Sequence, residues 1–177
     1  RLCLILMAAS SLLAADPNRI LLSRIQPTRT GLFVSNTDGT GERPLLPATG
    51  LDYNPSWSPD GKWIVFTSER DSSAELYRTK PDGTGIERLT DNPAYDDQAS
   101  FSPESNQIVF VTTRAGGTAD LWTLNLRTLK AKALTSGPGG DFRPVWSPDG
   151  KWIAFSSDRG STMPPAKGRW EHLQIAD

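Results

Sequence analysis

The feature that most constrains the fold is an internal repeat. The segment Trp57–Ile64 (WSPDGKWI) returns unchanged at Trp146–Ile153, and a related segment lies between them at Phe101–Ile108 (FSPESNQI). The three starts are 44 and 45 residues apart. Around each start, Asp, Phe and Arg also recur at fixed offsets: Asp52, Phe66 and Arg70; Asp96, Phe110 and Arg114; Asp141, Phe155 and Arg159. A repeat of this length indicates copies of one supersecondary unit.

Each unit contains the signals of four short strands. Ser-Pro-Asp-Gly supplies a tight turn after the first strand, and Lys62–Thr67 is rich in the aromatic and β-branched residues that favour strands. A third strand is predicted at Ala74–Thr79, and a fourth ends at Leu89-Thr90. Four-stranded units of this length are typical of β-propeller blades. We therefore predict an all-β fold of four-stranded antiparallel blades, in which the repeated aromatic residues pack between neighbouring blades.

The same spacing sets the expected domain organisation. Shifted by 44 residues, Ile20–Leu22 aligns with Ile64–Phe66, so the first unit begins at the second strand of a blade. We expect blade units at about 18–47, 52–91, 96–136 and 141–177, roughly 3.5 blades in all. A six-bladed ring would need about 270 residues at ~45 per blade, so we expect this chain to be a fragment of such a ring.

An uncharged apolar run precedes the repeats. Leu2–Ala15 is too short to span a bilayer as a helix, and it fits the core and end of a secretory signal peptide. We predict a signal peptide at residues 1–15, truncated at its start, and a periplasmic or secreted mature protein without a membrane span. The alternative is a buried first helix. The single cysteine, Cys3, lies in this run and excludes an intrachain disulfide framework.

Composition and motifs exclude several function classes. A net charge of −1 gives no electrostatic basis for binding nucleic acid. The sequence has one histidine, His172, and lacks a G-x-S-x-G elbow, a C-x-x-C pair, an H-E-x-x-H motif and a P-loop. We therefore expect no catalytic residues, no metal site and no cofactor.

Candidate binding residues lie where the chain enters the first strand of each blade. Asp52, Asp96 and Asp141 would surround one rim of the central channel, either as Asx turns or as a carboxylate ring that attracts a cation or a basic peptide. Two residues further on, the units differ: Asn54, Gln98 and Arg143. Residues that differ between otherwise similar units are candidates for determining which partner is bound. The repeated arginines are predicted to pair with carboxylates.

A second candidate is a loop insertion in the last unit. The stretch after Arg159 is about a dozen residues longer than its equivalents, and it carries Arg169, Trp170 and His172. Long propeller loops tolerate insertions and can carry binding residues. The alternative is that Trp170 and His172 pack back onto the blade.

The motif W-S-P-D-G-K-W-I-x-F, with the later P-D-G-T-G and closing L-T, resembles the WD-like (PD-type) repeats of the TolB-like propeller family. This resemblance implies a six-bladed periplasmic propeller that binds protein partners and catalyses no reaction. We therefore expect a binding scaffold for a protein or peptide in the cell envelope. Expressed alone, the fragment is expected to self-associate through its open edges.

Two other functions remain open. Similar repeats form the N-terminal propeller of prolyl-oligopeptidase-like serine peptidases, whose catalytic domain would be missing here. A propeller lyase acting on sugar acids is the third alternative, and it would need histidine or lysine facing the channel.

Overall fold

The computed structural model describes residues 18–26, 29–47 and 50–160. The predicted signal peptide and the candidate loop residues Arg169, Trp170 and His172 lie outside these ranges. The described residues form strands and turns, and none of them is in a helix. They accordingly contain no helix with the length and apolarity that a membrane span requires.

The strands form four antiparallel sheets, in each of which consecutive strands are neighbours. The first sheet contains β1 (Arg19–Gln26), β2 (Arg29–Asn36) and β3 (Arg43–Pro44). The second contains β4 (Asp52–Trp57), β5 (Ile64–Ser68), β6 (Glu75–Thr79) and β7 (Glu87–Arg88). The third contains β8 (Asp96–Phe101), β9 (Gln107–Thr112), β10 (Asp120–Asn125) and β11 (Ala131–Ala133), and the last contains β12 (Asp141–Trp146) and β13 (Ile153–Ser157). The predicted all-β fold of antiparallel blades is confirmed.

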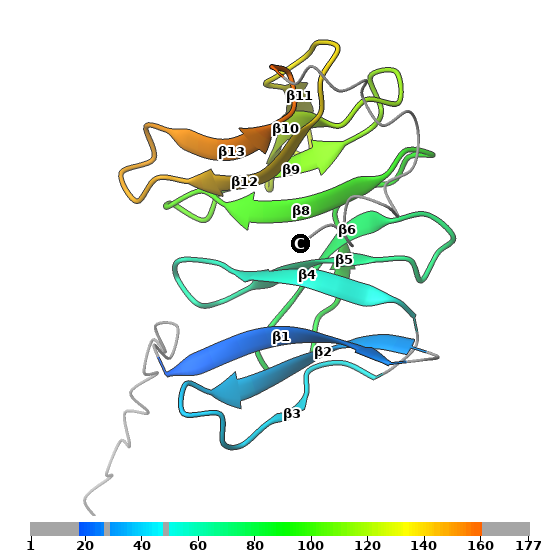
Figure 1. Cartoon of the computed structure of the whole chain (residues 1–177). Coiled ribbons are helices and arrows are strands. Elements are labelled where there is room, and N and C mark those ends of the chain that lie inside the picture. The colour runs from blue at the N-terminus through cyan, green and yellow to red at the C-terminus, as the bar shows by residue number, and fades with distance from the viewer. Residues whose placement is uncertain (1–17, 27–28, 48–49, 161–177) are drawn as a thin grey trace, which may run out of the picture.

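The four sheets lie face against face in chain order, as Figure 1 shows. Strand β4 contacts both β1 of the preceding sheet and β8 of the following one, and β8 in turn contacts β12. Strands β4, β8 and β12 are each the first strand of their sheet and occupy equivalent places along the array. In a propeller, the equivalent strand of each blade lies innermost, next to the central channel.

The turn after each innermost strand explains the Ser-Pro-Asp-Gly motif. Ser58 Oγ donates to Asp60 Oδ1 at 2.7 Å and accepts the amide of Trp63 at 2.9 Å. Gly61 has φ +66°, a left-handed conformation that glycine adopts without strain. Ser147 makes the same two contacts, with Asp149 and Trp152. The motif therefore fixes the direction in which the second strand of the blade begins.

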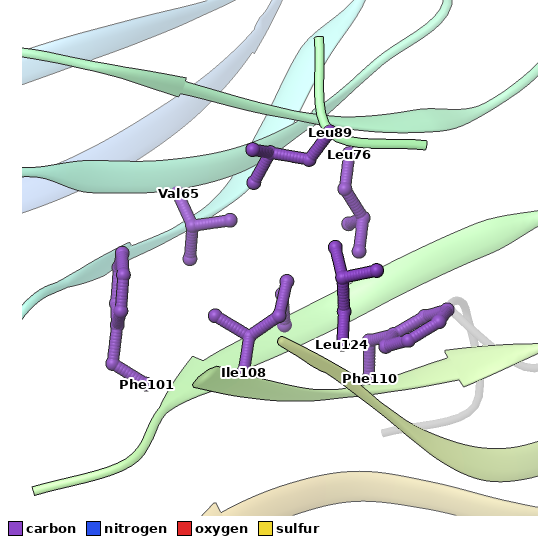
Figure 2. Close-up of a cluster of buried hydrophobic side chains, with 8 residues drawn as sticks. Val65, Leu76, Leu89, Phe101, Ile108, Phe110 and Leu124 are labelled. Atoms are coloured by element: carbon purple, nitrogen blue, oxygen red, sulfur yellow. The ribbon is translucent and has the colours of Figure 1, made fainter. Parts of the chain in front are cut away.

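The core lies between the sheets. Successive residues of a strand point to opposite faces, so Val65 packs toward the third sheet while Phe66 packs toward the first. Figure 2 shows the cluster between the second and third sheets, where Val65, Leu76 and Leu89 meet residues that include Phe101, Ile108 and Phe110. Phe66 and Phe110 are fully buried, which confirms that the repeated aromatic residues at these positions pack between blades.

Candidate functional site

Each aspartate that begins an innermost strand is held by the arginine 18 residues later. Arg70 Nη2 lies 3.0 Å from Asp52 Oδ1, and the equivalent distances are 2.6 Å for Arg114–Asp96 and 2.5 Å for Arg159–Asp141. The predicted pairing of the repeated arginines with carboxylates is thus confirmed. All three aspartates are buried.

Aromatic rings hold the arginines in place. The guanidinium of Arg70 lies 5.5 Å from the ring centre of Phe66 and 4.9 Å from that of Tyr77. Arg114 lies 5.4 Å from Phe110 and 4.9 Å from Trp122. A cation over an aromatic face is attracted by the ring quadrupole, and the ring also limits its movement. In each unit, the repeated Phe therefore positions the Arg, and the Arg binds the aspartate.

Burial and pairing shift the pKa values of these carboxyl groups in different directions. Burial raises the pKa of Asp96 above its ordinary value, although the Thr112 hydroxyl and Arg114 oppose the shift. For Asp141, burial acts in the same direction, but hydrogen bonds led by Arg159 outweigh it and lower the pKa. The contacts of Asp141 with Arg159, Ser157 and Thr135 therefore favour its ionised form.

The residues two positions after these aspartates share an unusual backbone conformation. Asn54, Gln98 and Arg143 have φ values of +50°, +54° and +52°. Each lies where the pairing between the first and second strands shifts register, which is a β-bulge. Three different side chains therefore occupy equivalent bulge positions, with the same backbone conformation, on the innermost strands.

These bulge residues also link neighbouring sheets. Asn54 Nδ2 donates to Asp97 Oδ1 across 2.8 Å, and the Arg143 amide donates to Gln98 Oε1 across 2.7 Å. The structure therefore brings Gln98 and Arg143 together directly, whereas Asn54 contacts Asp97, a residue that the sequence did not single out.

Asp97 is the centre of a buried network between the second and third sheets. Besides Asn54, its Oδ1 accepts the Thr67 hydroxyl at 2.6 Å and the Gln98 amide at 2.7 Å. Burial raises the pKa of Asp97, and these hydrogen bonds act against the shift. The signal for Asp97 in the sequence was its place beside Asp96 on the innermost strand.

Asp120 is a second acidic residue that sequence reasoning missed. Its counterpart Glu75 accepts the Thr90 hydroxyl at 2.5 Å, Arg88 Nη2 at 3.2 Å and the Asn92 amide at 2.8 Å. In the third sheet, Ala133 and Gly137 replace Arg88 and Asn92. Within the described part of the chain, Oδ1 of Asp120 is buried without a hydrogen-bond partner. Burial and the neighbouring Asp141 raise the pKa of Asp120, against the effect of Arg159.

These carboxylates are buried and distributed among several sheets. Across the described ranges, no group of three or more His, Cys, Asp or Glu side chains could hold a metal ion. The arrangement stabilises the innermost strands and orders the bulge residues along them. It is chemically suited to polar recognition by Asn54, Gln98 and Arg143.

Comparison with known proteins identifies the family. The TolB beta-propeller domain model matches residues 7–116. The Tol-Pal system protein TolB of Anaeromyxobacter sp. (strain K) is 29% identical over 132 residues, which are 72% of this chain and 30% of that protein. This chain therefore spans about a third of the length of the curated relatives it matches.

Solved structures give the same result. The crystal structure of TolB from Acinetobacter baumannii matches with a TM-score of 0.71 and 25% identity, covering 81% of this chain and 37% of that one. A puromycin hydrolase S511A mutant matches with a TM-score of 0.62 and 18% identity, covering 80% of this chain and 25% of that one, which shows a shared fold. From the match to the family model, the repeat and the sheets, this chain belongs to the TolB β-propeller family.

Proposed function

We propose that this chain is a non-enzymatic, TolB-like scaffold that binds a protein or peptide partner in the cell envelope. The observation that carries the proposal is the row of Asn54, Gln98 and Arg143 on one repeated backbone frame. The same backbone conformation occurs three times, while the side chain that it carries changes from an amide at Asn54 and Gln98, which are partly buried, to the exposed guanidinium of Arg143. Such variation on a rigid support suits the recognition of an irregular polypeptide surface better than that of a small symmetric ion.

The two kinds of rim residue have different roles in this proposal. Asp52, Asp96 and Asp141 are engaged by arginine and hold the strands. Asn54, Gln98 and Arg143 supply the contacts to the partner, and Arg143 is exposed. Arg169, Trp170 and His172 are a second group of candidate contacts. The apolar run Leu2–Ala15 and the relatives named as Tol-Pal system proteins support a periplasmic or secreted location.

Capture of a partner from envelope extract tests the proposal. The purified chain is used as bait beside two variants, Arg143→Ala at the rim and Arg127→Ala, an exposed arginine at the turn between β10 and β11. We expect a discrete partner whose recovery falls several-fold with Arg143→Ala but not with Arg127→Ala, at equal melting temperatures. Equal recovery with both variants, or no partner at all, contradicts the proposal.

The fold likeness to puromycin hydrolase supports one alternative, the propeller half of a serine peptidase. A fluorophosphonate probe, which labels activated serines, separates the two functions when it is applied to the full product of the gene. A binding scaffold stays unlabelled. Labelling that is lost when a single serine is replaced would favour the peptidase.

A further inference from the structure

Asp97 occupies a position at which the fold also accepts an apolar residue. It precedes the bulge residue of its innermost strand, and its equivalent in the last sheet is Phe142. Asp97 accepts the hydroxyl of Thr67 from the preceding sheet. Phe142 instead packs against the buried cluster that contains Val111, the equivalent of Thr67. Packing of one sheet on the next therefore does not require a carboxylate at this position.

Burial makes the Asp97 carboxylate costly for stability. Asp97 is 3% exposed, and Thr67 is fully buried. Taking an ionised carboxylate out of water has a large free-energy cost that hydrogen bonds offset only in part, and an apolar pair of similar volume is often at least as stable. Val111 and Phe142 show that such a pair is available to this fold. The contacts of Asp97 therefore indicate a role other than stability.

Two of the three bulge residues adopt a backbone conformation that their side chains disfavour. Asn54, Gln98 and Arg143 have φ values between +50° and +54°. Asparagine enters this left-handed region readily, whereas glutamine and arginine do so at a steric cost. The Gln98 amide donates to Asp97 Oδ1 at 2.7 Å, and the Arg143 amide donates to Gln98 Oε1 at 2.7 Å. These hydrogen bonds connect Asp97 to the backbone of Gln98 and, through Gln98, to that of Arg143.

The same carboxylate oxygen also holds the first bulge residue. Asp97 Oδ1 accepts Asn54 Nδ2 at 2.8 Å, and the Thr67 hydroxyl, which donates at 2.6 Å, fixes the carboxylate from the second sheet. Asn54 belongs to the second sheet and Gln98 to the third. One buried group therefore contacts bulge residues of two sheets, while its burial keeps it from direct contact with a partner.

We propose that Asp97 is a positioning residue for the rim. Its carboxylate orients Asn54 and the backbone of Gln98, and Gln98 in turn orients Arg143, so that the three residues meet a partner as one unit. This role rests on the proposed partner-binding function, and it adds that a buried residue, which touches no partner, determines how well the partner binds. The contributions of the three rim residues to binding are then not additive.

A double variant removes the carboxylate while keeping the interface packed. Thr67→Val with Asp97→Leu introduces an apolar pair like the one between the last two sheets. Leucine is chosen over phenylalanine because a Cβ on Gly140 would collide with the Phe142 ring, and the third sheet has Tyr95 in place of Gly140. The double variant should therefore keep the melting temperature of the unaltered chain or raise it.

Amide hydrogen exchange of the full chain, without any partner, measures the positioning. In the double variant, the amides of Gln98 and Arg143 should exchange about tenfold faster, because Gln98 loses its charged acceptor and its side chain no longer holds Arg143. The matched control is Glu75→Gln, which also changes a fully buried carboxylate and should leave both amides unchanged. Within the described residues, Glu75 accepts hydrogen bonds from residues outside the bulges: Ser73, Arg88, Thr90 and Asn92.

Unchanged exchange at both amides overturns the proposal, and so does equal acceleration in Glu75→Gln, which would mark a general loss of stability. A second variant covers the case in which the apolar pair unfolds the chain. Asp97→Asn should speed the exchange of the Gln98 amide, and adding Asn54→Asp should restore it, because the amide and the carboxylate then change places across the same contact. Absence of this rescue also overturns the proposal.

The capture experiment gives a second readout. The chain with Thr67→Val and Asp97→Leu should recover several-fold less partner than the unaltered chain, and adding Arg143→Ala to it should lower recovery by less than Arg143→Ala does alone. Equal recovery by the double variant and the unaltered chain overturns this inference but leaves the proposed function standing. An unaltered chain that captures no partner contradicts the proposed function instead, and the amide exchange still decides whether Asp97 positions the rim.

Discussion

At the scale of single residues, the turn between the first two strands of each blade contains one left-handed position, which is glycine in two units and serine in the third. Gly61, Ser105 and Gly150 occupy the same place, with φ values of +66°, +56° and +69°. Only glycine adopts this conformation without a steric cost. The Ser105 hydroxyl is also buried without a hydrogen-bond partner in the described part of the chain.

We expect Ser105→Gly to stabilise the protein by about 1 kcal/mol, because it removes both the left-handed strain and the unsatisfied hydroxyl. Urea unfolding measures the change. The reciprocal variant Gly61→Ser is the control and should destabilise by a similar amount. A loss of stability in Ser105→Gly would mean that the serine contributes a contact that offsets the strain.

Asp120 is buried, and its Oδ1 has no hydrogen-bond partner in the described part of the chain. Because burial and Asp141 raise its pKa in the folded state, the folded protein binds the proton more tightly than the unfolded one. The stability that comes from this group is therefore present at low pH and is lost as the pH rises from the ordinary value of 3.8 through the raised pKa.

Asp120→Asn should remove this pH dependence and stabilise the protein at pH 7 by about 1 kcal/mol. Urea unfolding of the wild type and the variant at pH 4 and pH 7 gives the difference. Glu104→Gln, at an exposed carboxylate, controls for loss of charge alone. A gain that is equal at both pH values would show that burial does not perturb Asp120.

At the scale of strands and sheets, the repeat predicted most of the fold. The periodic aromatic and β-branched residues located the strands, and Ser-Pro-Asp-Gly located the turn that joins the first two. The bulges were missed, although Pro55 and Pro144 inside innermost strands are a signal of irregular pairing. The contacts of Asp97 and Asp120 could not be predicted, because they depend on which side chains of neighbouring strands come within reach.

The anchor formed by Arg114 and Asp96 leads to a prediction at this scale. Asp96 is buried, and its Oδ2 lies 2.6 Å from Arg114 Nη2. Arg114→Met would leave the carboxylate buried without its cation, and we expect a loss of about 3 kcal/mol in the free energy of unfolding. The double variant with Asp96→Asn should recover most of this loss. If the double variant is no more stable than Arg114→Met, the arginine acts through its stacking on Phe110 and Trp122 instead.

At the scale of the whole molecule, the last sheet presents an apolar face that the other sheets bury. Trp63 packs against the cluster between the second and third sheets, whereas its counterpart Trp152 is 73% exposed. Val145 is also exposed on this sheet. An exposed group of large apolar side chains favours association, because contact removes it from water.

We therefore expect the purified 177-residue chain to self-associate as its concentration rises, with Trp152 in the contact. Sedimentation velocity over a hundredfold concentration range measures the effect. Trp152→Lys should shift association to higher concentration, because a charged side chain resists desolvation. Leu129→Lys changes a side chain that is also exposed but lies at the turn between β10 and β11, so it should leave association unchanged. A wild-type chain that stays monomeric throughout, or equal effects of the two variants, would show that the face of the last sheet does not drive association.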